Sequence, residues 1–161
     1  MSRSIGPTLR KYWQTLSRLP GGRWLFSRLL GVVVPYSGTL GATVLTLEPG
    51  HCIVTLKERR RVRNHLRSAH AMALANLAEM ATGLALLAGL PDGMRAILVG
   101  FEIEYRKKSR GRLVAECRGE TPTQLRERTV TMTAKIRDAA GDVTAVATAR
   151  WLVGPERRHA D

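Results

Sequence analysis

The chain has 161 residues and a mass of 17.8 kDa, a length typical of one domain with a substantial hydrophobic core. Hydrophobic residues make up 44% of it and charged residues 24%, which excludes a disordered, collagen-like or disulfide-rich secreted chain. The formal net charge of +13 favours an anionic partner, such as nucleic acid, a membrane surface or a phosphorylated small molecule. Of the 26 basic residues 21 are arginine, a bias that genome composition alone would also produce.

The two cysteines, Cys52 and Cys117, form neither a CxxC pair nor a cluster with histidine. This argues against a structural zinc site and against a disulfide framework, so free thiols and no metal or cofactor are expected. The apolar stretches near the N-terminus are interrupted by Arg18, Arg23 and Arg28, which is not the pattern of a secretory signal. The protein is therefore expected to be cytoplasmic.

Residues 1–37 predict a helical arm. Pro7 suits the first turn of a helix, and Pro20-Gly21-Gly22 ends that helix before a second one that runs from Arg23 to Val34. The first 40 residues hold six basic and no acidic side chains. Such an arm could pack its apolar face on the domain or lie on an anionic membrane, and the sequence leaves both open.

The rest of the chain predicts strands around one long helix. Alternating segments at 39–47 and 52–57 flank a turn and predict a β-hairpin, and an apolar helix is predicted over 69–90. The loops at 108–111 and 139–142 are short and contain glycine, which predicts antiparallel hairpins. The four segments after the helix that predict strands are Ala96–Arg106, Arg112–Glu120, Leu125–Arg137 and Val143–Leu152.

The first of these four strands predicts a sheet with one apolar face. Val99, Phe101, Ile103 and Tyr105 alternate with polar residues and are expected to point the same way. The helix over 69–90 is the only segment long and apolar enough to cover that face. The sequence thus predicts an α+β fold in which an antiparallel sheet wraps around a long central helix.

Glu79 is the most unusual residue of that helix, being the only carboxylate between Glu58 and Asp92. An unpaired charge in an apolar setting is costly, and burial is expected to raise its pKa toward that of a useful general base. Asn76 lies one turn earlier on the same face. The alternative explanation is a structural ion pair between Glu79 and one of the many arginines.

The start of the same helix is a second candidate site. Asn64, His70 and Ala71 lie at or just before its first turn, whose backbone N–H groups lack partners within the helix. Such groups can bind a carbonyl oxygen and act as an oxyanion hole. A Ser68 cap beside surface histidines is the alternative without a site.

The stretch RNHLRSAHAMALANLAEMATG resembles the active-site segment of hotdog-fold acyl-CoA thioesterases of the phenylacetate-pathway type. In that pattern a histidine follows an asparagine by six residues and an acid follows the histidine by nine, and Asn64, His70 and Glu79 keep both spacings. The sequence is also similar to uncharacterised hotdog domains with glutamate at the acid position. Ala71-Met72 stands where the thioesterases have Gly-Gly. The resemblance covers about residues 38–153 and implies a hotdog fold there, followed by a polar tail at 154–161.

The resemblance also implies an activity, the hydrolysis of an acyl-CoA thioester to the free acid and coenzyme A. Glu79 would act as base or nucleophile, the Ala71 amide would polarise the thioester carbonyl, and His70 and Asn64 would shape the site. It further implies a homodimer or a dimer of dimers, in which each site combines Glu79 of one chain with the helix start of the other.

Substrate contacts are expected around this centre. Met72 and Asn76 share the helix face of Glu79, and Met72 is expected to narrow the approach of the acyl group. Two arginine- and lysine-rich clusters are candidates for binding the phosphates of coenzyme A. The basic residues that we single out from them are Arg63, Arg67, Lys107, Lys108 and Arg110.

Two other functions stay open at this point. One is a module that binds acyl-CoA without cleaving it, and the other is a basic protein that binds nucleic acid or a membrane surface. Only 5% of the residues are aromatic, which argues against a stacking platform for nucleic acid. A peripheral membrane contact through residues 1–37 remains an expectation.

Overall fold

The structure, a computed structural model, describes residues 5–156. Its helices are α1 (Ile5–Leu16), α2 (Gly22–Val33), α3 (Pro35–Gly38) and α4 (Ala71–Gly89), with a 3₁₀ turn at Arg60–Val62. Its strands are β1 (Thr43–Glu48), β2 (His51–Lys57), β3 (Met94–Tyr105), β4 (Arg112–Arg118), β5 (Arg128–Arg137) and β6 (Val143–Pro155).

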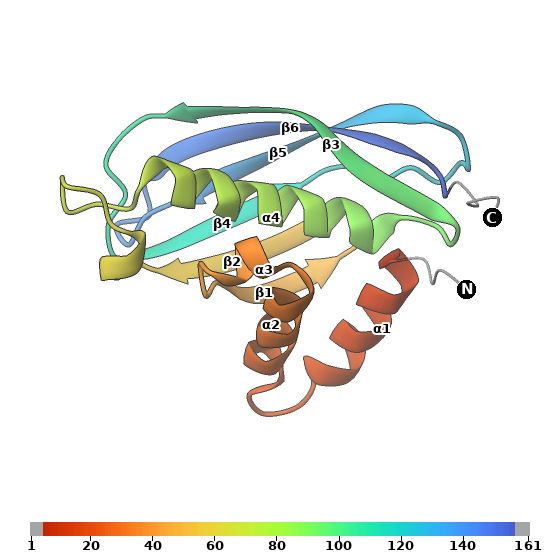
Figure 1. The fold of residues 1–161 in the computed structure, drawn as a ribbon, viewed down its shortest axis with the longest axis horizontal. Coiled ribbons are helices and arrows are strands. Elements are labelled where there is room, and N and C mark those ends of the chain that lie inside the picture. The colour runs from red at the N-terminus through yellow and green to blue at the C-terminus, as the bar shows by residue number, and fades with distance from the viewer. Residues whose placement is uncertain (1–4, 157–161) are drawn as a thin grey trace.

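The six strands form one antiparallel sheet in the order β1-β2-β4-β5-β6-β3, so β1 and β3 are its edges. The sheet curves around α4, and α1 and α2 lie beside the β1 edge (Figure 1). The predicted α+β architecture, with an antiparallel sheet around a central helix and a helical N-terminal arm, is confirmed.

The core lies between α4 and the concave face of the sheet. Leu77 and Leu86 of α4 are fully buried, and Ala145, Ala147 and Ala149 of β6 are buried as well. Alanines on the sheet let the helix approach closely, because a small side chain leaves room for the large one that faces it. By length and composition α4 could also span a membrane, but most of it is buried inside the domain.

The N-terminal arm packs on the domain. Arg10 of α1 donates hydrogen bonds to the carbonyls of Ala88 and Leu90, at 2.6 and 3.1 Å, which holds α1 at the end of α4. Trp13 and Phe26 join α1 to α2 with an edge-to-face contact whose ring centroids are 5.1 Å apart. The first of the two expected arrangements of the arm is therefore present.

The loop at 108–111 does not form the predicted hairpin. The neighbour of β3 is β6, and the chain crosses from one sheet edge to the interior position of β4. β3 and β4 are three positions apart in the sheet, a distance of about 14 Å. The connecting residues 106–111 can span this distance, because six extended residues reach about 20 Å. A short loop with glycine therefore does not imply that the strands it joins are neighbours. The hairpin predicted at 139–142 is confirmed by the pairing of β5 with β6.

The sheet corrects three further details. A register shift between Leu98 and Gly100 turns Val99 outward, away from the face that carries Phe101 and Ile103. The strand expected from Leu125 begins at Arg128 instead. The last strand continues to Pro155, into the expected polar tail, of which residues 157–161 lie outside the described part of the chain.

A core truncation tests the central position of α4. Leu77→Ala is expected to lower the free energy of unfolding by about 2–5 kcal/mol, because it leaves a cavity in a fully buried position. Urea denaturation measures this value. The matched control is Leu125→Ala, since Leu125 is 63% exposed, and this change is expected to cost less than about 0.5 kcal/mol. Equal effects of the two changes would contradict the placement of α4.

Candidate functional site

Two cavities lie along the exposed side of α4. The first, which we call the carboxylate cavity, has a volume of about 390 Å³ and lies between α2, α3 and the middle of α4. The second, which we call the helix-start cavity, has a volume of about 250 Å³ and lies between α3 and the first turns of α4. The volume of the carboxylate cavity lies in the range of about 300–1,000 Å³ that is typical of small-molecule sites, which are mostly apolar with a few polar groups.

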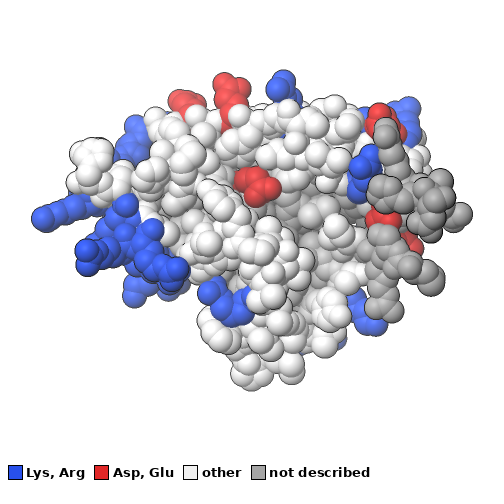
Figure 2. All heavy atoms as spheres, viewed as in Figure 1, with Lys and Arg blue, Asp and Glu red and all other residues white. Residues whose placement is uncertain are grey.

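Glu79 stands in the wall of the carboxylate cavity. It is the only charged residue of α4, and Figure 2 shows an isolated acidic side chain over the middle of that helix. Within residues 5–156 its carboxylate forms no ion pair and accepts no hydrogen bond. Burial raises the pKa of Glu79 above that of an ordinary carboxyl, which makes it a stronger base when ionised.

Two N–H donors in the same wall also lack partners. The Nε atom of Arg28 and the indole Nε1 atom of Trp151 are buried without a hydrogen bond in the described residues. The other end of the Arg28 guanidinium donates to the Ala42 carbonyl at 3.0 Å, which fixes the side chain. An apolar cavity with a few unpaired polar groups is the usual make-up of a ligand site.

His70 caps α4 and leaves one backbone amide free. Its Nδ1 atom accepts a hydrogen bond from the Met72 N–H at 3.1 Å, and its carbonyl accepts one from Ala73. The Ala71 N–H has no acceptor in the described part of the chain. This amide is therefore the available donor at the positive end of the helix dipole.

Asn64 orders the loop that leads into α4. Its Oδ1 atom accepts hydrogen bonds from the Leu66 N–H, the Ser68 N–H and the Ser68 hydroxyl, at 2.9, 3.2 and 3.2 Å. This arrangement supports the left-handed backbone of Arg67, whose φ is 53°. Asn64 thus acts on the helix start through the loop.

Tyr105 fixes the first turn of α4 from outside the helix. Its hydroxyl donates to the Ala71 carbonyl at 2.9 Å, although the two residues are far apart in sequence. This contact was not predictable from the sequence, because it depends on how the end of β3 meets α4. Arg28 and Trp151 were missed for the same reason, since each enters the cavity from a separate element.

A hydrogen bond joins the walls of the two cavities. Ser37, in the wall of the carboxylate cavity, donates to the Asn76 side chain, in the wall of the helix-start cavity, at 3.0 Å. Asn76 is thus buried and already paired within the protein. Met72 lines the helix-start cavity and is 57% exposed, so the structure places it near the Ala71 amide and about two turns from Glu79.

The carboxylate and the free amide are too far apart to act together within one chain. Glu79 lies eight residues beyond Ala71, which is about 12 Å along an α-helix. A carbonyl attacked near Glu79 needs an oxyanion donor about 3 Å from its oxygen. One chain by itself therefore does not complete the arrangement that the family resemblance implies.

The basic residues differ in whether they are paired. Arg63 is bound to Glu58, with 2.6 Å between Nε and Oε1, and Lys107 pairs with Asp138 and Asp142. The singled-out basic residues that are exposed and form no ion pair within residues 5–156 are Arg67, Lys108 and Arg110.

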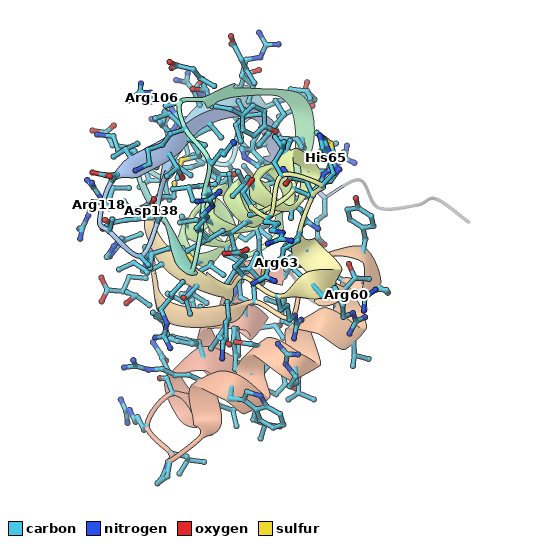
Figure 3. The ribbon with its side chains drawn as sticks, turned by 90° about the vertical axis from the view of Figure 1, so that its left-hand side faces the viewer. Arg60, Arg63, His65, Arg106, Arg118 and Asp138 are labelled. Atoms are coloured by element: carbon cyan, nitrogen blue, oxygen red, sulfur yellow. The ribbon has the colours of Figure 1, made fainter. Side chains whose placement is uncertain are left out.

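Basic side chains gather at one end of the molecule, over the segment between β2 and α4 (Figure 2). Figure 3, which faces this end, shows Arg60 and Arg63 on that segment and Arg106 at a separate position above them, at the end of β3. The two clusters therefore flank the start of α4.

The thiols do not qualify as nucleophiles. Cys52 and Cys117 are opposite each other on β2 and β4, and both are free and buried. Burial raises the pKa of Cys52 strongly and that of Cys117 to about 12, so neither forms a thiolate near neutral pH. In residues 5–156 no three histidine, cysteine or acidic side chains converge on a metal site.

A family described as "Domain of unknown function (DUF4442)" matches residues 22–153. The chain belongs to the DUF4442 family. No curated protein sequence matches it. The match begins at α2, so the family domain includes the second half of the N-terminal arm together with the whole sheet and α4.

Solved structures place this DUF4442 protein among hotdog folds. A structural-genomics crystal structure is 27% identical, with a TM-score of 0.78, over 94% of this chain and 99% of its own. A protein of unknown function from Pseudomonas aeruginosa, described as a probable thioesterase, is 21% identical over 86% and 97%, with a TM-score of 0.73. A hypothetical thioesterase from Streptococcus pneumoniae, solved with coenzyme A, is 19% identical over 80% and 99%, with a TM-score of 0.66.

The expected resemblance to hotdog thioesterase-like proteins is confirmed by these matches. It includes the phenylacetate-pathway type, since a phenylacetic acid degradation protein from Thermus thermophilus is 24% identical over 73% of this chain and 97% of its own, with a TM-score of 0.63. The matches establish the fold and the family of the chain. The residues of the DUF4442 site and their roles stay predictions that rest on the geometry described above.

The role of Asn64 in this DUF4442 protein can be tested by a matched pair of variants. Asn64→Ala is expected to lower the free energy of unfolding by about 1–3 kcal/mol, because the buried Ser68 loses its hydrogen-bond acceptor. Asn64→Asp keeps the acceptor oxygen and is expected to cost less than about 1 kcal/mol. Urea denaturation of both variants measures the difference, and equal losses would rule out the role of the side-chain oxygen.

Proposed function

We propose that the protein hydrolyses an acyl-CoA thioester to the free acid and coenzyme A. The observation that carries this proposal is Glu79, a carboxylate that has no partner within residues 5–156 and has a raised pKa in the wall of an apolar cavity. Thioesterases among the structurally similar proteins support it, as does the coenzyme A bound to the Streptococcus pneumoniae protein.

The chemistry suits these groups. Glu79 takes a proton from a water molecule, whose oxygen forms a bond to the thioester carbon while the carbonyl oxygen becomes an oxyanion. A backbone N–H stabilises that oxyanion, the C–S bond breaks, and the thiolate of coenzyme A leaves and takes up a proton. Alternatively, the Glu79 carboxylate attacks the carbon itself, the C–S bond breaks and the thiolate of coenzyme A leaves and takes up a proton. Water then hydrolyses the mixed anhydride to the free acid and regenerates Glu79.

A second copy of the chain would supply the amide. The free Ala71 N–H and Glu79 of one chain are about 12 Å apart along the helix. The start of α4 of a partner could instead approach the carboxylate from the exposed side of α4. β3 is an edge strand whose outer side is unpaired in the described structure, and Ile97 and Val99 on it are 46% and 52% exposed. We propose that the sheets of two copies pair along β3.

The phosphates of coenzyme A are proposed to bind at the basic end. Arg67, Lys108 and Arg110 form no ion pair within residues 5–156 and flank the start of α4. Arginine binds phosphate oxygens in pairs through its fork of N–H donors, and lysine adds a point charge. Lys107 is the weaker candidate, because two aspartates already hold its ammonium group.

Replacing the carboxylate tests the proposal directly. Glu79→Gln is expected to lower the rate at least about a hundredfold, because the amide keeps the shape but neither accepts a proton nor attacks a carbonyl. Release of the coenzyme A thiol from short, medium, long and aromatic acyl-CoAs measures the rate.

The wild-type rate is also expected to fall on acidification at a higher pH than an ordinary carboxyl would give, because burial raises the pKa of Glu79.

The matched control for this change is Glu120→Gln, at an exposed loop position, which is expected to keep the wild-type rate. Turnover that persists in the Glu79 variant would remove this residue from the mechanism. No turnover by the wild type with any acyl-CoA, together with a raised melting temperature in its presence, would instead support a non-catalytic binding module.

A proline substitution tests the amide and the shared site together. Ala71→Pro removes the free N–H at the first helical position, where proline is tolerated, and His70 before it is already extended, with φ −66° and ψ 142°. The rate is expected to fall about 10²- to 10³-fold. Mixing Ala71→Pro and Glu79→Gln chains under re-pairing conditions is expected to restore about a quarter of the activity, because each mixed dimer then has one intact site.

The control for the mixing experiment is each variant re-paired with itself, which is expected to stay inactive. If the mixture also stays inactive although light scattering shows dimers, both groups must come from the same chain. A monomer at working concentration would contradict the shared site outright.

A further inference from the structure

α2 presents an apolar stripe to solvent, which we call the α2 stripe. Its members recur at helical spacing on one side of the helix and are Leu25, Leu29, Val32 and Val33, with exposed fractions of 41%, 49%, 77% and 78%. The side of α2 that faces the domain carries the buried Ser27, whose hydroxyl accepts from the Val44 N–H at 2.9 Å. Isolated apolar residues are normal on a surface, but a stripe of four marks a contact with another apolar phase.

The arm that carries this stripe also carries exposed basic side chains. Lys11, Arg18 and Arg23 are exposed on α1, on the α1–α2 connection and at the start of α2. No acidic residue precedes Glu48 in the sequence. Over α2, in the lower part of the view, Figure 2 shows uncharged atoms and a basic side chain. The surface therefore complements a negatively charged partner.

Aromatic residues flank the stripe at both ends. Trp24 is 59% exposed and Tyr36 is 72% exposed. Tryptophan and tyrosine prefer the boundary between lipid headgroups and acyl chains, because their rings are apolar and carry one polar group. A helix with an apolar stripe, basic flanks and such aromatic residues is typical of helices that lie in the plane of a membrane surface.

A second copy of the chain fits the α2 stripe less well. A two-fold contact would place the same patch of both copies together, so Lys11, Arg18 and Arg23 would meet like charges without a carboxylate to pair with. In addition, α2 lies beside β1, at the sheet edge opposite β3 (Figure 1). Pairing of two copies along β3 thus leaves the stripe uncovered.

The stripe continues into the carboxylate cavity. Val32 belongs to the stripe and also lines the cavity, together with Leu30 and Gly31 of the same helix. An acyl chain that leaves a bilayer beside α2 would therefore reach the cavity wall along apolar side chains rather than through water.

We infer that α2 docks the protein on an anionic phospholipid bilayer. The α2 stripe enters the boundary between headgroups and acyl chains, and the exposed basic residues of the arm bind the lipid phosphates. The corollary that the acyl group comes from a membrane-bound long-chain thioester rests on the proposed function. The docking itself does not depend on it.

Vesicle binding by the full chain tests this inference. The protein is expected to sediment with vesicles that contain phosphatidylglycerol and to bind phosphatidylcholine vesicles much more weakly. Trp24 is the exposed tryptophan, since Trp13 and Trp151 are 8% and 6% exposed, so its emission is expected to shift to shorter wavelength on binding. Trp24→Phe should remove the shift and keep the sedimentation.

Surface variants separate the apolar from the electrostatic contribution. The double change Leu25→Ser and Leu29→Ser is expected to weaken vesicle binding about tenfold or more, because two apolar side chains that enter the bilayer are lost. Leu125→Ser is the matched control, because Leu125 is 63% exposed but lies outside the arm, and it should bind like the wild type. Arg23→Gln is expected to weaken binding about fivefold and to reduce its dependence on salt.

Three outcomes decide the matter. A folded wild-type protein that stays in the supernatant with anionic vesicles would overturn the inference. So would a drop in the light-scattering mass of the Leu25 and Leu29 double variant, because the stripe would then be a contact between copies. Glu79→Gln is expected to bind vesicles like the wild type, so a failure of the proposed hydrolysis and a failure of docking give different results.

Discussion

The structure depends on the burial of α4 against the concave face of the sheet. An apolar helix can be enclosed almost completely only if the sheet curves around it and small residues such as Ala145 and Ala147 let it approach. Enclosure leaves one open side, where the arm lies and where both cavities form. A carboxylate on that side is dehydrated and has no partner within residues 5–156, and this raises the pKa of Glu79.

The architecture was predictable from periodicity because the helix and the strands each bury one face. The order of the strands was not, since the 108–111 loop suggested a hairpin and the chain instead crosses the sheet at that end. The exposure of Val99 was also unpredictable, because it follows from a register shift that depends on the partner strand β6. Local pattern determines which way a strand faces, but not its neighbour or its bulges.

The candidate site also contains residues that were predictable from the sequence and residues that were not. Asn64, His70 and Glu79 could be selected from their spacing, and the structure shows how His70 leaves the Ala71 amide free while Asn64 holds the preceding loop. Tyr105 and Ser37 could not be selected, because each reaches the site from an element distant in sequence. The pairing of the basic residues was the hardest feature to predict. A basic residue in the sequence does not show whether an acidic side chain forms an ion pair with it in the structure.

The position of β3 has a consequence for how the chain folds. This strand of 12 residues is synthesised before β4 and β5, yet its partner in the described structure, β6, follows both of them. During synthesis β3 therefore has two unpaired edges until β6 has emerged, and its pairing closes a long loop, which slows folding. A chain that ends prematurely would leave this strand exposed to other chains, so aggregation of incomplete products is the characteristic risk of this topology.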